Sequence, residues 1–244
     1  MKPSDPGRRD FLAATAALAI APGVFLYAPA EAKNASEAAS ARVRWGMLID
    51  TTRCSEDCRA CVDACSRENG YSAKPGRNDS RTSVQWIRKV RLTDRKTGEA
   101  TSLPLMCQHC AQPPCVDVCP TGASFKRADG IVLVDRHRCI GCRYCMMACP
   151  YKARSFVHEP VADQNPDVPR GQGCVEGCTL CMHRVDRGAQ PVCVEACAAA
   201  GHGAILFGDL NDPQSEISRR VRAVRTTALR ADLRLDPGVR YEGL

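Results

Sequence analysis

The sequence predicts an α+β fold made of two small modules of the βαβ type, one nested within the other along the chain, with loop insertions and a helical C-terminal tail. The 244 residues include 17 cysteines, gathered in four groups, whereas aromatic residues make up only 5%. The segments "MLIDTTRC" (47–54) and "IVLVDRHRC" (131–139) both run from a short apolar strand through an aspartate to a cysteine. This repeat indicates two copies of one unit, held together by something other than packed aromatic rings.

Residues 1–32 resemble a twin-arginine export signal. Arg8 and Arg9 stand before an apolar run at 11–27, and the small residues at 28–32 provide A-x-A cleavage sites. By this resemblance the chain is exported already folded, so its thiols reach the periplasm occupied rather than free to form disulfides. The alternative is an uncleaved membrane anchor, although 17 residues with an internal Pro-Gly are short for a span.

The first cysteine group, "CSEDCRACVDAC", opens a segment that we place at 45–106. Its first gap is three residues long, and no proline follows its last cysteine. A polar insertion comes next, within which "SVQWIRKVRL" (83–92) predicts a further strand. The candidate ligands of this group are Cys54, Cys58, Cys61 and Cys65.

The second and third groups define an inner module at 107–160. The third, "CIGCRYCMMACP", has the C-x2-C-x2-C-x3-C-P spacing of bacterial ferredoxins. Three thiolates at this spacing lie on one loop and can hold three irons of a cube, while the fourth, one helical turn further on, reaches a neighbouring cluster. A zinc knuckle uses two separated C-x-x-C pairs instead. The second group, "CQHCAQPPCVDVCP", widens the middle gap to four residues and contains His109, which we expect beside the cluster rather than on it. The candidate ligands are Cys107, Cys110, Cys115, Cys119, Cys139, Cys142, Cys145 and Cys149.

The fourth group is split and lies in a segment at 161–210, which we expect to pack against 45–65. Cys174 is left over. It stands three residues before Cys178 and so copies the spacing of the first group, which leaves open whether Cys174 or Cys193 completes the set or Cys174 is a spare thiol. "AILFGDL" (204–210) predicts a strand that matches 47–50. The four cysteines of this group are Cys178, Cys181, Cys193 and Cys197.

The tail, 211–244, is rich in arginine. Ile217, Val221, Val224 and Ala228 recur at helical spacing, which predicts a solvated helix over 217–230 packed on one face. Contact of this helix with a membrane or a partner is the alternative.

The net charge of +7 also bears on function. The positive charge does not indicate a nucleic-acid partner, because the arginines do not alternate with aromatic residues and the sequence shows no nucleic-acid-binding motif. Four oxidised four-iron clusters carry about −2 each with their thiolates, which brings the total near −1 (+7 minus about 8). Two functions fit: an electron relay without substrate chemistry, or an enzyme in which the irregular first group leaves one iron open.

Taken together, the groups and the intervening "HRVDRG" resemble the four-cluster ferredoxin-like electron-transfer subunits of membrane and molybdenum oxidoreductases. The resemblance covers nearly the whole chain after the signal. It implies four [4Fe-4S] clusters, two in each module, with the first group sharing clusters with the fourth and the second with the third. The implied sets are Cys54, Cys58, Cys61 with Cys197; Cys178, Cys181, Cys193 with Cys65; Cys107, Cys110, Cys115 with Cys149; and Cys139, Cys142, Cys145 with Cys119.

Within this family, "QWIRKV", "CQHCAQPPCVDVCPTGASFKRADGIVLVD" and "CIGCRYCMMACPYKARSF" resemble the iron–sulfur O subunits (DsrO) of the Dsr membrane complexes, which accompany dissimilatory sulfite reductase. The resemblance implies a periplasmic subunit of sulfur metabolism that associates with the inner membrane through partners. Those partners would be a quinone-interacting integral membrane subunit and a multihaem cytochrome c. The alternative in the family is the electron-transfer subunit of a tetrathionate, thiosulfate or polysulfide reductase.

Overall fold

The structure of this protein is a computed structural model, which describes residues 19–21, 24–25, 39–71, 82–162 and 164–244. Arg8, Arg9 and most of the export signal lie outside the described residues. The chain divides into two units, Met1–Ala38 and Ala39–Leu244. In the first unit β1 (Ala19–Ala21) and β2 (Val24–Phe25) pair in antiparallel fashion. Among the helices formed by described residues, none has the length and apolarity needed to cross a membrane.

The second unit is built on a four-stranded sheet with the order β10-β3-β12-β11. The strand β3 (Trp45–Asp50) contains the apolar start of the first copy of the sequence repeat, and four of its six residues are buried. It pairs antiparallel with β10 (Ile205–Asp209) and parallel with β12 (Val239–Glu242). The short strand β11 (Thr226–Thr227) completes the far edge. This sheet joins the first cysteine group to the end of the fourth, which are about 150 residues apart along the chain.

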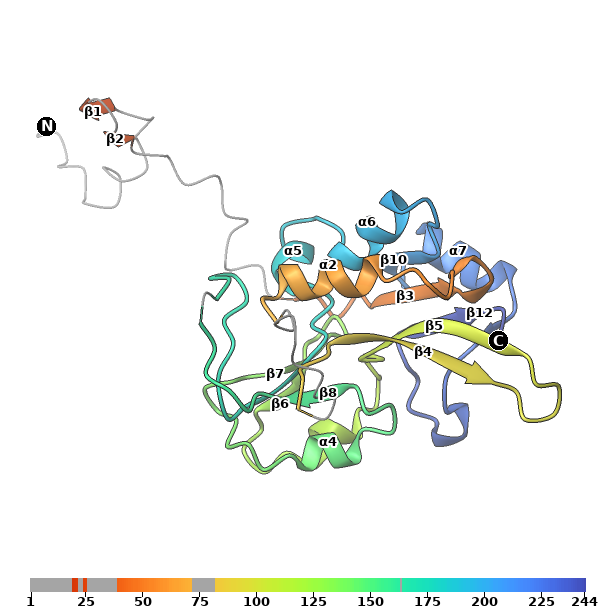
Figure 1. Ribbon diagram of the computed structural model, residues 1–244, viewed down its shortest axis with the longest axis horizontal. Helices are drawn as coiled ribbons and strands as arrows, with labels where there is room; N and C mark the ends of the chain where they lie inside the picture. Colours follow the sequence, from red (N-terminus) through yellow and green to blue (C-terminus); the bar gives the residue numbers. More distant parts are fainter. Residues whose placement is uncertain (1–18, 22–23, 26–38, 72–81, 163) are drawn as a thin grey trace, which may run out of the picture. The chain divides into compact units, whose positions relative to one another are not determined.

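Helices lie along one side of this sheet in Figure 1. The helix α2 (Ala60–Glu68) packs against α6 (Val192–Ala199), and α7 (Glu216–Ala223) packs against β10. The hydroxyl of Ser215 caps α7 by accepting a hydrogen bond from the backbone N–H of Ser218 at 3.2 Å.

The remaining elements are short except for one hairpin. The hairpin is the longest of them, and its turn is held by the Asp94 carboxylate, which accepts from the backbone N–H of Lys96 at 2.6 Å. These elements are η1 (Thr51–Arg53), the hairpin β4 (Ile87–Thr93) and β5 (Ala100–Met106), α3 (Pro114–Asp117), β6 (Ser124–Lys126) paired with β7 (Val132–Val134), α4 (Tyr144–Ala148), β8 (Arg154–Phe156) paired with β9 (Val175–Gly177), α5 (Met182–Val185) and η2 (Ala231–Leu233). Of these, β6, β7, β8 and α4 lie together away from the sheet in Figure 1.

The mixed helix and sheet fold expected from the sequence is confirmed. Strands occur near 47–50, 83–92, 131–134 and 204–210, as expected. The structure presents 39–244 as one compact unit. The division of this unit at 106, 160 and 210 therefore stays a prediction.

The helix expected over 217–230 is confirmed for its first half and wrong for its second. The helix α7 ends at Ala223, and the chain then forms β11, η2 and β12. Val239 and Tyr241 of β12 are fully buried, because their two-residue alternation places both side chains on the covered face of the sheet. The end of the chain is thus a core strand rather than a solvated appendage.

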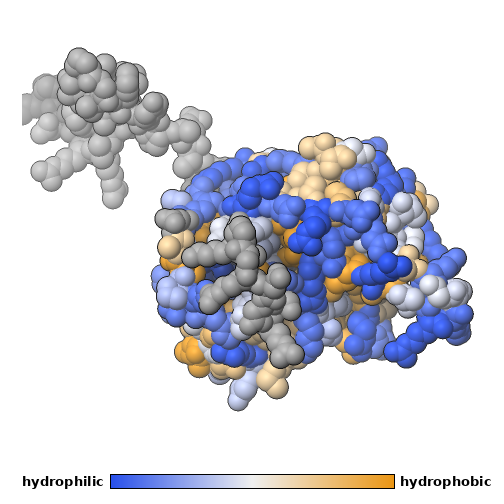
Figure 2. All heavy atoms as spheres, viewed as in Figure 1, coloured by the Kyte–Doolittle hydropathy of each residue, from blue (hydrophilic) through white to orange (hydrophobic). Residues whose placement is uncertain are grey.

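Two pairs of aromatic rings stack in and against the core. Trp45 stacks on Phe207 with ring centroids 5.1 Å apart, and Tyr71 stacks on Trp86 at 5.4 Å. Most of the visible surface over this core is hydrophilic (Figure 2), as the charged composition suggests. Cysteines supply much of the remaining interior, and Cys61, Cys65, Cys193 and Cys197 belong to the main core cluster.

Candidate metal centres

Sixteen of the 17 cysteines lie in four sets of four, which we call sites 1 to 4. The four cysteines of each of sites 1, 3 and 4 line one small pocket. Site 2 consists of the four remaining thiols. Cys65 and Cys181 lie close enough to Cys193 for their charges to act on it, and Cys65 and Cys193 act on Cys178 in the same way. Site 1 is Cys54, Cys58, Cys61 and Cys197; site 2 is Cys65, Cys178, Cys181 and Cys193; site 3 is Cys107, Cys110, Cys115 and Cys149; site 4 is Cys119, Cys139, Cys142 and Cys145. These are the sets that the family resemblance implies, and their role as ligands stays a prediction.

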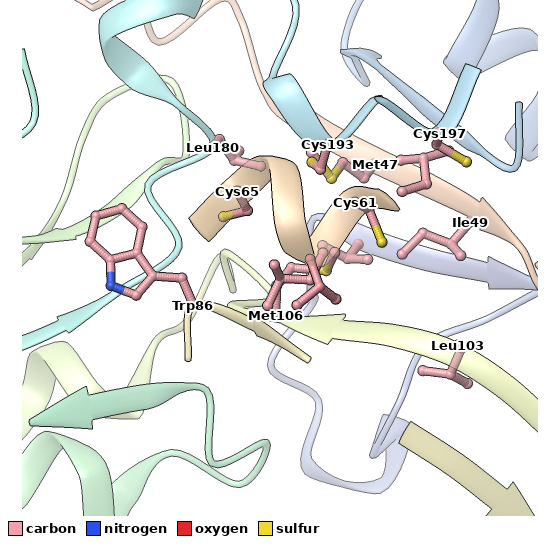
Figure 3. Packing of buried hydrophobic residues seen from close by; sticks show 14 of the residues in the cluster. Met47, Ile49, Cys61, Cys65, Trp86, Leu103, Met106, Leu180, Cys193 and Cys197 are labelled. Atoms are coloured by element: carbon pink, nitrogen blue, oxygen red, sulfur yellow. The ribbon is translucent and has the colours of Figure 1, made fainter. Parts of the chain in front are cut away.

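Sites 1 and 2, the outer pair, share two helices. Each helix carries two cysteines four residues apart, about one helical turn, so that one thiol reaches each site. The helix α2 gives Cys61 to site 1 and Cys65 to site 2, and α6 gives Cys193 to site 2 and Cys197 to site 1. Figure 3 shows these four side chains on the two neighbouring helices, and Met106 and Leu103 of β5 belong to the same buried cluster. The two helices therefore run between two sites in opposite senses.

The inner pair repeats this arrangement with shorter helices. Cys115 lies in α3, and Cys119 follows it by four residues, so that the first belongs to site 3 and the second to site 4. Cys145 lies in α4, and Cys149 is its C-terminal cap, with the order of the two sites reversed. The x3 spacing seen in the sequence is thus the turn of helix that joins the two sites of a pair.

The loops between these helices bend sharply to bring thiols to one cavity. Arg143 and Cys181 adopt left-handed backbone conformations with φ of 64° and 49°. Gly141 has φ of 71°, and a Cβ atom there would collide with the backbone carbonyl of Gly173. The glycine in "CIGC" is therefore required by space as well as by conformation.

Several of the buried thiols lie in surroundings that disfavour their charged form in the absence of a metal. Burial, followed by the negative charge of Cys54 and Cys197, raises the pKa of Cys61 to about 12. Burial also raises the pKa of Cys65 and of Cys110 to about 12. Because a thiolate is the ligand form, cations at these sites must supply the stabilisation that burial removes.

Hydrogen-bond donors reach several of the sulfurs. The backbone N–H groups of Ser124 and Ala204 donate to Cys119 Sγ at 3.3 Å and to Cys197 Sγ at 3.2 Å. Such donors stabilise thiolate ligands and tune the potential of a cluster that they hold. Similar bonds run from Val175 N to Cys139 Sγ, from Leu180 N to Cys178 Sγ and from Asn69 Nδ2 to Cys65 Sγ.

The four sites suit a multinuclear sulfide cluster better than a single ion. Within 39–71, 82–162 and 164–244, no group of three or more cysteine, histidine, aspartate or glutamate side chains converges closely enough to hold one metal ion. Site 3 is also flanked by buried donors. His109 Nδ1 accepts from Val132 N at 3.0 Å, which leaves the proton on Nε2, and this atom has no partner among the described residues. The sulfides of an iron–sulfur cluster can accept a hydrogen bond from a donor such as Nε2–H, whereas a zinc ion cannot. The backbone N–H of His109 faces the thiol of Cys107 in site 3.

Interactions between their thiols connect the sites in the order 1, 2, 3, 4, which we call the row. The charge of Cys61 in site 1 acts on Cys193 in site 2. The charge of Cys107 in site 3 acts on Cys178 in site 2. Cys115 in site 3 acts in turn on Cys145 in site 4.

Cys174, which the sequence could not separate from Cys193, lies apart from Cys178 and Cys181. Its thiol donates to the Arg136 carbonyl at 3.3 Å and lies against Cys139, a member of site 4. The structure therefore gives the place in site 2 to Cys193. None of the 17 cysteines, all of which lie in described segments, forms a disulfide.

Two basic side chains that contact the sites were missed in the sequence. Lys89 Nζ donates to Cys54 Sγ at 3.1 Å, and Arg154 Nη2 donates to Cys115 Sγ at 3.2 Å. They lie in the stretches "QWIRKV" and "CPYKARSF", but neither has a fixed spacing to the cysteine that it contacts. Only the pairing of the strands that carry them brings them to the sites.

Comparison with known families gives the chemical identity of these sites. A 4Fe-4S dicluster domain, Fer4_11, matches residues 99–209, and a second 4Fe-4S dicluster domain, Fer4_7, matches residues 53–123. Together with the 17 cysteines they show that the chain carries about four [4Fe-4S] clusters.

Whole-chain relatives are also found. The chain is 42% identical to the Hdr-like menaquinol oxidoreductase iron-sulfur subunit 1 of Archaeoglobus fulgidus, over 97% of this chain and 98% of that protein. It is 37% identical to a tetrathionate reductase subunit of Salmonella typhimurium, over 98% and 89%. It is 34% identical to the iron-sulfur cluster-binding subunit of the menaquinone reductase of Nitratidesulfovibrio vulgaris, over 82% and 89%. The chain belongs to this family of iron–sulfur electron-transfer subunits of membrane quinol oxidoreductases.

Proposed function

We propose that this chain relays electrons within a membrane-bound redox complex of sulfur metabolism, in the periplasm, between a quinone-interacting membrane subunit and another redox subunit. The observation that carries the proposal is the row of four cysteine sites, which begins and ends near the surface. Cys142 of site 4 is exposed, and Cys54 and Cys58 of site 1 are partly exposed. A row with two accessible ends suits single electrons that enter at one end and leave at the other.

The two ends of the row differ in polarity. Site 4 is surrounded by large apolar side chains that face outward: Ile140, Tyr144 and Met147 are 67%, 57% and 73% exposed. We call these three residues the apolar rim. Exposed apolar side chains gathered in one place mark interaction surfaces. Site 1 is instead bordered by exposed polar residues, among them Ser55 and Glu56. We therefore assign the apolar rim to the integral membrane partner and the polar end to a soluble redox partner.

The relatives support a quinone as the other reactant, because the names of two of them specify menaquinol or menaquinone. The resemblance to the O subunits of Dsr complexes favours a role beside dissimilatory sulfite reductase, with a multihaem cytochrome c as a further partner. The relationship to a subunit of a tetrathionate reductase favours, as the second candidate, a relay that serves a reductase of tetrathionate, thiosulfate or polysulfide.

The test uses the full chain in its native membrane. After mild detergent extraction and purification through an affinity tag on this chain, a reduced menaquinol analogue is added, and reduced clusters are followed by electron paramagnetic resonance. We expect reduction in the extracted complex and none in the isolated subunit. Turnover of sulfite, thiosulfate or tetrathionate by the isolated subunit would overturn the relay assignment.

A matched pair of surface variants tests the membrane end. Ile140→Glu combined with Met147→Glu should abolish quinol-driven reduction while the iron content is kept. Leu92→Glu, which changes an apolar side chain of similar character on β4 that is 41% exposed, should leave it unchanged. Equal quinol-driven reduction in both variants would show that the membrane partner docks elsewhere.

A further inference from the structure

Arg154 is a buried cation placed between two of the four sites. It opens β8, its side chain crosses Gly177 of β9, and the residue is only 8% exposed. Its Nη2 donates to Cys115 Sγ of site 3 at 3.2 Å. Its charge also acts on Cys107 of site 3 and on Cys145 of site 4. The guanidinium therefore faces cysteines of both inner sites.

No carboxylate in the described residues forms an ion pair with Arg154. The nearest buried candidate on the paired strand, Glu176, is held by Arg170 at 2.6 Å. The buried Asp129 is likewise held by Arg127 at 2.7 Å. Arg154 Nη1 is buried and has no hydrogen-bond partner among the described residues. A guanidinium that is buried in this way is costly unless anions face it.

The anions that face Arg154 are the thiolates and clusters of sites 3 and 4. An oxidised [4Fe-4S] cluster with four thiolates carries about −2, and reduction by one electron makes this about −3. A fixed positive charge in a low-dielectric interior stabilises the more negative state more strongly. In each transfer step one cluster is oxidised and its neighbour in the row is reduced by the same electron. No covalent bond is formed or broken, and no proton is transferred.

We propose that Arg154 sets the reduction potentials of the inner pair, raising site 3 most and site 4 to a smaller extent. Site 3 responds most because Arg154 donates to Cys115 Sγ at 3.2 Å and its charge acts on two cysteines of site 3, Cys107 and Cys115, but on one of site 4. Donors to ligand sulfur raise the potential of a cluster. The guanidinium also acts as the counter-charge that lets both anionic sites share one buried region. Arg154 is thus a positioning and tuning residue for electron transfer rather than a cluster ligand.

The test is a redox titration of the isolated, anaerobically purified full chain, followed by electron paramagnetic resonance together with iron analysis. In Arg154→Gln we expect two of the four midpoints to fall. For site 3 the reduced-to-oxidised ratio at a fixed potential should drop at least tenfold, which corresponds to about 59 mV for one electron. Arg154→Lys keeps the charge, and its midpoints should lie closer to those of the wild type. The inference concerns the proposed relay, but the titration needs no partner, so a failure to find a quinone partner would leave it unaffected.

Two controls separate charge from packing. Arg88 donates to the backbone carbonyls of Tyr151 and Lys152, at 2.9 and 3.0 Å, in the loop that leads to Arg154. Arg88→Gln should therefore disturb the same loop without moving these two midpoints. Lys89→Gln removes a cation that contacts site 1 and should move a different midpoint.

The outcomes decide between the explanations. Unchanged midpoints in Arg154→Gln with full iron would overturn the inference, as would an equal shift of all four. If Arg154→Gln fails to assemble the inner pair, Arg154→Lys decides: assembly with near-normal midpoints supports the counter-charge role, and loss of the pair in both variants contradicts it.

Discussion

Replacing Cys193 and Cys174 separately by serine tests the assignment of the sites. Both cysteines are buried, at 6% and 8% exposure, and both belong to the stretch that the sequence left ambiguous. Cys193 lies among the thiols of site 2, whereas Cys174 lies beside Cys139 and donates to a backbone carbonyl. Since each of four sites has four cysteines, the loss of one cluster removes a quarter of the iron, from about 16 atoms per chain to about 12.

We expect Cys193→Ser to contain about 12 irons and Cys174→Ser about 16. Because site 2 lies between site 1 and site 3 in the row, Cys193→Ser should also stop electrons from passing between the two ends. The assay combines iron and acid-labile sulfide analysis with reduction by the menaquinol analogue in the extracted complex. Sites 3 and 4 should then still be reduced, while site 1 stays oxidised. A full complement of iron in Cys193→Ser together with its loss in Cys174→Ser would refute the assignment.

Three further predictions follow from the fold and the export signal. Tyr241→Ala should lower the thermal midpoint clearly, since deleting a buried ring costs about 3–5 kcal/mol, and Tyr241→Phe should lower it slightly, as measured by loss of cluster absorbance on heating. Replacing Arg8 and Arg9 by lysine should leave an iron-loaded protein in the cytoplasm on cell fractionation; normal export would contradict the twin-arginine route. Gly141→Ala should lose about a quarter of the iron through a clash with a backbone carbonyl, whereas Gly98→Ala, where a Cβ meets nothing within 4 Å, should keep all of it; full iron in both would show that the "CIGC" loop can move aside.

Much of the fold around the cysteines could be predicted from the sequence, because local spacing determines it. The x3 gaps before Cys65, Cys119 and Cys149 correspond to one turn of helix, and the strands before Cys54 and Cys139 are short apolar runs followed by an aspartate. Motifs of this kind are read within about ten residues, where the chain has little freedom. The grouping of distant cysteines into shared sites needed more: it came from the family resemblance and not from spacing.

The parts that the sequence did not reveal depend on contacts between distant segments. Arg154 reaches Cys115 only because β8 and β9 pair beside the inner sites, and Lys89 reaches Cys54 only because β4 lies beside the first cysteine loop. The strand β12 was overlooked because only four residues carry its alternation, in a tail whose arginines suggested a solvated helix. Tyr241 shows what fixes this strand: its hydroxyl donates to the Pro104 carbonyl at 3.2 Å, 137 residues away in the chain.

The net charge of +7 suggested that basic residues balance the anionic clusters, but the structure distributes this balance unevenly. Lys89 donates to a sulfur of site 1 and Arg154 to a sulfur of site 3. In the described part of the chain, the hydrogen bonds that reach the sulfurs of site 2 come from neutral donors, the Asn69 amide and the backbone N–H of Leu180.

Site 2 is also enclosed, since three of its four cysteines are buried and the fourth is partly so, as in site 3, which has Arg154 beside it. Burial disfavours the more negative, reduced state, and neutral donors offset this less than cations do. Site 2 should therefore hold an electron least readily. Electrons would then rest at site 1 or in the inner pair and pass site 2 as the one uphill step, so the midpoint that disappears in Cys193→Ser should be the lowest of the four.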